Sequence, residues 1–227
     1  DRCLCVSDIW QQTLKKDYGI YAHRVINGVS SRFSPQPDGS EPALAHAYGI
    51  HSGPIFFTVG GIEPRKNSIN LLKAFYQVRQ QQPQAQLVIA GGATLFDYQT
   101  YRQAFMELVN AYGLADSLVL PGVVPDADLP GLYRLADAFV FPSVQEGWGL
   151  VVLEAIASGL PVLTSNQAPF TEFLSPQSAM LVAPEDTAQI AAAMLTLLDA
   201  NIVQPLVHNS QPLVSQYSWQ RDRKSVV

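Results

Sequence analysis

Short apolar runs alternate with stretches of helical periodicity along most of the chain. The apolar runs predict buried strands over residues 54–59, 86–90, 117–120, 138–143, 161–164 and 179–182. Between them, apolar residues at helical spacing predict helices over residues 69–78, 97–112, 128–136, 150–157 and 186–200. Strands that alternate with helices form a parallel sheet covered on both faces. The pattern therefore predicts the α/β class, with a Rossmann-like parallel sheet and helices on both faces.

The first 40 residues follow a separate pattern. Residues 2–6 and 23–27 predict two strands, and the segment between them predicts a helix that begins near Ser7 and ends near Tyr18. Serine is a favoured N-cap residue because its hydroxyl can accept a hydrogen bond from a free N–H of the first turn. Residues 34–40 are rich in Pro, Gly and Ser and predict a linker.

Two carboxylates, Glu146 and Glu154, are separated by seven residues, with a glycine-aromatic-glycine turn between them. The run at 138–143 precedes this turn and a helical pattern from Leu150 follows it, so the motif is a strand, a Gly-rich loop and a helix. A helix N-terminus favours phosphate because its N–H groups are unpaired and carry partial positive charge. Carboxylates can accept hydrogen bonds from sugar hydroxyls. The motif thus indicates a ligand with both phosphates and hydroxyls, such as a nucleotide-sugar.

A second Gly-rich loop, from Gly60-Gly61 to Arg65-Lys66-Asn67, joins the strand at 54–59 to the next helix. Arg offers a planar fork and Lys a point charge, and both suit phosphate oxygens. Cations are disfavoured at a helix N-terminus unless an anion is near, which favours a binding role over a solvated surface. The loop has neither the Walker spacing nor the Gly-x-Gly-x-x-Gly pattern. Because ligands bind outside the carboxyl ends of parallel strands, we expect both loops to serve one site.

Together these residues resemble the donor-binding half of GT-B glycosyltransferases, specifically the retaining group called glycosyltransferase family 4. The likeness extends to further segments, at 25–29 with 33–35, 87–92, 120–123 and 157–162. The resemblance implies transfer of a sugar from a nucleotide-diphosphate donor, a UDP- or GDP-sugar, with retention of configuration. It also implies no cofactor and no bound metal.

The resemblance assigns roles to individual positions. The catalytic candidates are Arg65 and Lys66, which would neutralise the departing diphosphate, and Glu146, which would contact the donor sugar. Glu154 would bind the ribose hydroxyls. The full set of candidate donor-binding residues is Gly60, Gly61, Gly91, Val124, Gly147, Trp148, Gly149, Leu150 and Glu154, with 147–149 contributing backbone N–H groups.

The family's connection motif normally falls in mid-chain, whereas here it falls near residue 27. We therefore expect residues 1–29 to be a remnant of the N-terminal acceptor domain and 30–40 the linker. Residues 41–215 would form the donor-binding domain and 216–227 the truncated start of a C-terminal helix. A glycan, lipid or small-molecule acceptor would bind through the missing half, and we expect the isolated chain to be inactive. For the full-length enzyme we expect a cytoplasmic location, with peripheral membrane contact.

Composition narrows the alternatives. Hydrophobic residues make up 48% of the chain and charged residues 15%, enough apolar surface for a full core. The net charge of −5 argues against a nucleic-acid partner. Cys3 and Cys5 are expected to be buried thiols, because two cysteines are too few for a disulfide framework. Two other interpretations remain: another GT-B enzyme, such as a sugar-nucleotide epimerase or a phosphorylase, or a non-catalytic nucleotide-sugar binding module.

Overall fold

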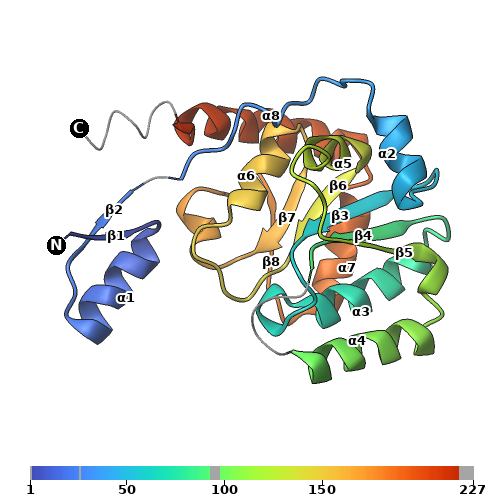
Figure 1. The fold of residues 1–227 in the computed structure, drawn as a ribbon, viewed down its shortest axis with the longest axis horizontal. Coiled ribbons are helices and arrows are strands. Elements are labelled where there is room, and N and C mark those ends of the chain that lie inside the picture. The colour runs from blue at the N-terminus through green and yellow to red at the C-terminus, as the bar shows by residue number, and fades with distance from the viewer. Residues whose placement is uncertain (1, 26, 93–97, 220–227) are drawn as a thin grey trace.

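A six-stranded parallel sheet with the order β5-β4-β3-β6-β7-β8 lies at the centre of the structure (Figure 1). The structure is a computed structural model that describes residues 2–25, 27–92 and 98–219. The strands of this sheet are β3 (Ile55–Val59), β4 (Gln86–Ala90), β5 (Leu118–Gly122), β6 (Ala138–Phe141), β7 (Val162–Ser165) and β8 (Met180–Val182). Every neighbouring pair in the sheet is parallel, which confirms the predicted α/β class.

Helices cover both faces of this sheet. One face carries α2 (Glu41–Tyr48), α5 (Leu129–Leu135), α6 (Leu150–Ala157) and α8 (Ala200–Gln216), and the other carries α3 (Ser68–Arg79), α4 (Gln99–Ala111) and α7 (Thr187–Thr196). Short 3₁₀ turns lie at η1 (Pro64–Lys66), η2 (Ala115–Ser117) and η3 (Phe170–Glu172). No single helix among the described residues is long and apolar enough to cross a membrane.

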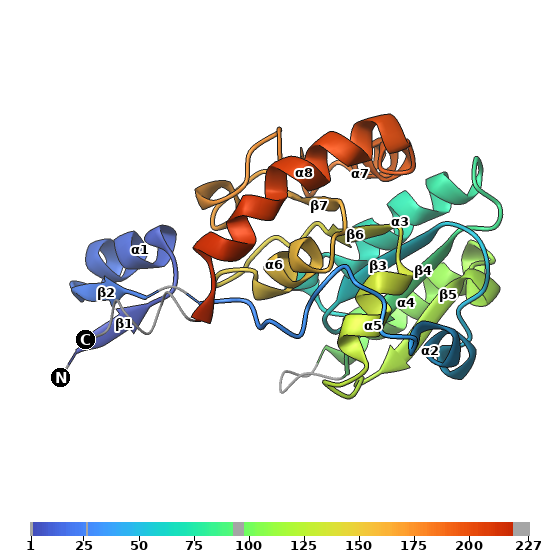
Figure 2. The same cartoon turned by 90° about the horizontal axis from the view of Figure 1, so that it is seen from above.

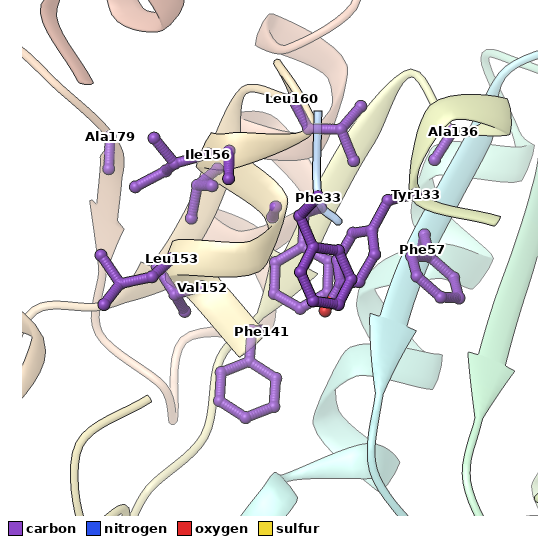
Figure 3. Packing of buried hydrophobic residues seen from close by; sticks show 14 of the residues in the cluster. Phe33, Phe57, Tyr133, Ala136, Phe141, Val152, Leu153, Ile156, Leu160 and Ala179 are labelled. Carbon is purple, nitrogen blue, oxygen red and sulfur yellow. The ribbon is translucent and has the colours of Figure 1, made fainter. Parts of the chain in front are cut away.

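Successive side chains along the central strands point to opposite faces of the sheet, so the residues of these strands belong to two separate hydrophobic cores. Phe57 and Phe139 point into the core under α5 and α6, whereas Phe56 and Val140 point into the core under α3 and α7. Figure 3 shows the first core, where Tyr133 of α5 lies among aromatic rings. Its ring meets Phe57 edge-on, with centroids 5.0 Å apart. These strands are buried on both faces, which is why they read as continuous apolar runs rather than as alternating ones.

The helix predicted over 186–200 forms as α7, but it ends at Thr196, short of the predicted end at Ala200. A second helix, α8, begins at Ala200 and is bent by 94° from α7 at a short break. Asp199 lies at the break, where its carboxylate accepts the backbone N–H of Asn201 and caps the start of α8. Neither α8 nor α2 was predicted from the sequence, and in α8 the reason is that Pro205 and Pro212 lie inside the helix. The expected start of the 97–112 helix at Asp97 lies outside the described residues, as does residue 26 at the end of the second predicted strand.

The N-terminal segment forms a small unit of its own. The strands β1 (Cys3–Cys5) and β2 (Ala22–Arg24) pair in parallel around α1 (Asp8–Tyr18), in the predicted strand-helix-strand order. Both views place this unit at one end of the molecule, apart from the main sheet (Figures 1 and 2). Ser7 is the N-cap residue of α1 as expected, but within the described part of the chain its hydroxyl forms no capping hydrogen bond.

The segment that joins this unit to the main sheet is bound to α5 by ion pairs close to the C-terminal end of the segment. Arg134 of α5 pairs with Asp38 at 2.6 Å and with Glu41 at 2.5 Å, and its side chain is nearly buried. These contacts hold the pKa of Asp38 at about 2, because hydrogen bonds from Ser40 and from Arg134 favour its charged form. The predicted linker is therefore bound to the main domain at its C-terminal end.

Candidate functional site

The two Gly-rich loops meet because β3 and β6 are neighbours in the sheet. Both strands run parallel, so their carboxyl ends lie at the same edge. The backbone N–H of Val144 and the hydroxyl of Ser143 both donate to the carbonyl oxygen of Arg65, at 2.8 and 2.7 Å. The structure thus brings the loop after β3 and the loop after β6 into one site.

Glu146 is the centre of a cluster of charges in this site. One oxygen of its carboxylate lies 2.7 Å from Nζ of Lys66 and 3.3 Å from a guanidinium nitrogen of Arg65. The hydroxyl oxygen of Ser143 lies 2.8 Å from the same oxygen, which is an alternative acceptor for its one hydrogen. The side chains of Glu146 and Lys66 are only 10% and 13% exposed, so their attraction is weakly screened by solvent. Sequence reasoning named both cations and Glu146, and the structure places them together.

Two further polar residues belong to this cluster and were missed by sequence reasoning. Glu63 is 1% exposed, and its carboxylate accepts from the Arg65 guanidinium at 3.0 and 3.3 Å. Ser143, described above, is also buried. Glu63 carried a signal that could have been used: it stands two residues before Arg65, in a loop expected to be close to a ligand. Glu63 orients Arg65 while Glu146 faces both cations.

Lys66 lies in an apolar setting that weakens its hold on the proton. Its ammonium is 4.5 Å from the ring centroid of Phe141. Burial lowers the pKa of Lys66, and the Glu146 carboxylate opposes that shift. A further anion that reaches this ammonium would stabilise its charged form, because the anion would replace the hydration that the ammonium lost on burial.

Glycines let the backbone segments of the site approach one another. A Cβ on Gly91 would lie 2.4 Å from the backbone of Gly60, so the loop after β4 touches the loop after β3 directly. Gly149, the N-cap residue of α6, has a φ of +95°, which residues with a Cβ rarely adopt. Gly61 is buried and Gly147 is exposed on the same loops. A cavity of about 280 Å³ opens beside Gly91, between β4, β5 and Arg102 of α4.

Glu154 belongs to a second cluster on α6. The hydroxyl of Tyr133 donates to its carboxylate at 3.0 Å and also lies 3.2 Å from the carbonyl oxygen of Val151. Burial raises the pKa of Glu154, and the hydrogen bond from Tyr133 and the charge of Arg32 oppose the shift. Tyr133 is fully buried, and burial with the nearby Glu154 raises its pKa well above the ordinary value. Tyr133 was not foreseen as a site residue.

Three candidate positions have side chains that face the protein interior. Trp148 is buried, with its ring centroid 4.8 Å from that of Phe173. Val124 and Leu150 pack against the core under α5 and α6. Any contact of these three residues with a ligand at the sheet edge is therefore expected to use the backbone. For Trp148, this is the role assigned from sequence.

The raised pKa of Glu154 leads to a stability prediction. When a carboxyl group has a higher pKa in the folded state than in the unfolded state, the folded protein loses stability as the pH rises from the unfolded pKa to the folded pKa. This loss persists at pH values above both. We therefore expect Glu154→Gln to raise the melting temperature of the ligand-free chain at pH 7, and to leave it unchanged at pH 3. The side-chain amide of the introduced glutamine has a carbonyl oxygen that can still accept the hydrogen bond from the Tyr133 hydroxyl. Thermal unfolding at both pH values tests this, and a lower melting temperature at pH 7 would contradict it.

Among the described residues, no group of three or more His, Cys, Asp and Glu side chains could hold a metal ion. The positive charge of the site comes from Arg65, Lys66 and the N-terminus of α6.

Comparison with known proteins identifies the family of the chain. Residues 44–209 match the family described as glycosyl transferases group 1. A mannosylfructose-phosphate synthase of Agrobacterium fabrum is 29% identical over 86% of this chain, and an O-antigen chain mannosyltransferase B of Escherichia coli is 27% identical over 96%. The chain spans 44% and 57% of the length of these two relatives. A sucrose-phosphate synthase of Zea mays is 32% identical over 73% of the chain, which spans 17% of that relative.

Solved structures show the same fold. The structure of Anabaena Alr3699/HepE in complex with UDP and glucose superposes with a TM-score of 0.89 at 20% identity, covering 99% of this chain and 61% of that one. The C-terminal domain of LpcC from Francisella tularensis, a glycosyl transferase group 1 protein, superposes with a TM-score of 0.74 at 24% identity, over 85% of this chain and all of that domain. With the family match over 44–209 and the GT-B fold of these neighbours, the chain belongs to group 1 of the glycosyl transferases.

Proposed function

We propose that this chain is the donor-binding portion of a retaining glycosyltransferase of family 4, which takes its sugar from a UDP- or GDP-sugar. The observation that carries the proposal is the pairing of Lys66 and Arg65 with Glu146 at the carboxyl edge of the sheet. Two cations beside a helix N-terminus suit a diphosphate, and a nearby carboxylate suits a sugar hydroxyl.

The diphosphate is the leaving group of the proposed reaction, and negative charge builds up on it as the sugar departs. Preorganised positive groups aimed at that charge lower the barrier, because they need no reorganisation during the reaction. In this structure Lys66 is paired with Glu146. We expect the diphosphate to compete for Lys66, which would release the Glu146 carboxylate to accept a hydroxyl of the transferred sugar. Binding and sugar recognition would then be linked through one ion pair.

Glu154 would serve the nucleotide. It lies more than a turn into α6, beyond the N-terminus that faces the phosphates, and Tyr133 holds one of its oxygens. The other oxygen would accept a hydrogen bond from a ribose hydroxyl. The cavity beside Gly91 is the proposed place for the base, because it lies at the ends of β4 and β5.

The division of labour between the two carboxylates is the main test of the proposed function. A hydrogen bond to a charged group contributes about 1.5–3 kcal/mol, so Glu154→Ala should weaken UDP or GDP binding roughly 10- to 100-fold. Glu146→Gln should not weaken the free nucleotide, but should weaken the nucleotide-sugar. Calorimetry on each variant, with nucleotide and with nucleotide-sugar, measures both effects. Equal loss of free nucleotide in the two variants would show that the assignment is wrong.

Metal independence is a separate prediction. Because Arg65, Lys66 and backbone N–H groups supply the positive charge, we expect UDP or GDP to stabilise the chain equally with and without excess EDTA. A ligand at a hundred times its dissociation constant adds about 2.7 kcal/mol, which thermal shift detects readily. A shift that appears only after Mg²⁺ or Mn²⁺ is added would overturn this prediction.

The acceptor site is proposed to lie in the part of the relatives that this chain does not span. Transfer requires donor and acceptor to be held together, which can contribute roughly 7–11 kcal/mol to lowering the barrier. The alternative function is a module that binds nucleotide-sugars without catalysis. Hydrolysis of the bound nucleotide-sugar distinguishes this alternative from the proposed enzyme. Slow hydrolysis of a bound nucleotide-sugar to free sugar and nucleotide would favour the catalytic interpretation, and its complete absence would favour the binding module.

A further inference from the structure

Helix α1 reaches the Glu146 loop through one side chain. The indole N–H of Trp10 donates to the carbonyl oxygen of Glu146 at 3.1 Å, although the two residues are 136 positions apart. Trp10 is half-buried, so this hydrogen bond is partly protected from water. The contact joins the N-terminal unit to the loop that carries the central carboxylate of the proposed site.

Helix α1 is itself held by a carboxylate from the main domain. Glu172 of η3 accepts the backbone N–H groups of Asp8 and Ile9 at 2.8 and 2.9 Å. It thereby caps the first turn, the task expected of Ser7, and its negative charge suits the N-terminus of the helix. The same short turn reaches the other end of the loop, since a Cβ on Gly149 would lie 2.6 Å from the ring of Phe170.

The main domain binds the carbonyl oxygens in the first part of the Glu146 loop, residues 143–149. The carbonyl oxygen of Ser143 accepts a hydrogen bond from the hydroxyl of Ser165, the last residue of β7, at 2.6 Å. The carbonyl oxygen of Val144 accepts one from the side-chain amide of Gln167 at 2.8 Å. The Glu146 carbonyl oxygen is instead bound by Trp10, and the following residue, Gly147, is exposed and has no side chain. Without a partner for the Glu146 carbonyl oxygen, the backbone could rotate where it enters Gly147, because glycine allows a wide range of conformations. Such a rotation would carry the Glu146 carboxylate away from its partners.

We propose that Trp10 is a positioning residue for Glu146 and that Glu172 positions Trp10 by capping α1. This inference rests on the proposed function only where it assigns Glu146 to the donor sugar. The small N-terminal unit then has a role in donor recognition, although it lies outside the main sheet. Neither Trp10 nor Glu172 needs to touch the ligand.

The test is Trp10→Phe, which keeps an aromatic ring and removes the indole N–H. We expect the amides of residues 144–149 to exchange with deuterium faster, and nucleotide-sugar binding to weaken about 2- to 10-fold, the contribution of one neutral hydrogen bond. Free UDP or GDP binding should stay within about twofold, because Glu154 and the cations are not displaced. Tyr18→Phe is the matched control: it removes a polar group from an exposed position of the same helix.

A second variant tests the route through α1. Glu172→Ala should speed exchange in both 8–11 and 144–149, and should weaken the nucleotide-sugar no more than Trp10→Phe does. The double variant should match the more affected single variant, because both changes remove the same contact. Unchanged exchange at 144–149 in Trp10→Phe would overturn the inference, whether or not the chain binds donors. If the unaltered chain binds no donor but exchange at 144–149 is faster in Trp10→Phe, the proposed function is rejected and the positioning role of Trp10 is kept.

Discussion

Replacing Lys66 by Met is expected to weaken UDP or GDP binding by about 100-fold, the loss of one strong charge-assisted hydrogen bond. It is also expected to destabilise the ligand-free chain by about 2–3 kcal/mol, because the nearly buried Glu146 side chain would lose its nearest cation. That estimate lies below the roughly 3–5 kcal/mol of fully buried pairs, since Arg65 and Ser143 still contact the carboxylate. Met retains an apolar chain of similar length and removes the ammonium that lies over Phe141.

A double variant separates the two effects. Lys66→Met combined with Glu146→Gln removes both charges, so the lost stability should largely return while nucleotide binding stays weak. Lys73→Met, a change to a lysine of α3 outside the charge cluster, is the matched control and should alter neither quantity. Denaturant unfolding and calorimetry provide the two measurements. If the double variant is less stable than Lys66→Met, the ion pair is not the source of the loss.

The architecture could be predicted because each strand of the main sheet is a short apolar run with a clear end. Both faces of the sheet are covered, so runs such as 138–141 are uninterrupted and easy to recognise. The break between α7 and α8 could not be seen in the same way. Pro205 and Pro212 indicate that a helix should end, whereas the packing of α8 against α6 keeps it intact through both.

The site was predictable where its residues lie close together in sequence and less so where the fold brings distant ones together. Arg65, Lys66 and Glu146 stood out because each lies in a Gly-rich loop that follows a strand. Tyr133 carried no such signal, because it reaches Glu154 from α5, 21 residues away. Trp10 and Glu172 are more distant still, and their hydrogen bonds depend on how the N-terminal unit sits against the main domain. Local patterns can predict loops and helix ends, but they cannot predict contacts of that kind.

Replacing Gly91 by Ala is expected to cost about 3 kcal/mol of stability, the upper part of the usual range for overpacking. The added Cβ would lie 2.4 Å from both the carbonyl carbon and the carbonyl oxygen of Gly60, and 2.9 Å from the backbone nitrogen of Gly61. Gly60 cannot move away freely, because its N–H donates to the carbonyl oxygen of Ala90 at 2.8 Å at the end of the β3–β4 pair. The strain must therefore spread into the loop that carries the cations.

Gly92→Ala is the matched control for this change. Its Cβ would also approach another atom to 2.4 Å, but that atom is the Cγ2 of Val123, a side chain that is 82% exposed and free to rotate. We expect a cost below about 1 kcal/mol for Gly92→Ala, and nucleotide binding that is weakened at least 10-fold more by Gly91→Ala than by Gly92→Ala. Denaturant unfolding followed by calorimetry with UDP or GDP tests both parts. Equal losses in the two variants would show that the close approach of Gly91 to Gly60 does not shape the site, because the two substitutions differ mainly in whether backbone or a mobile side chain must move.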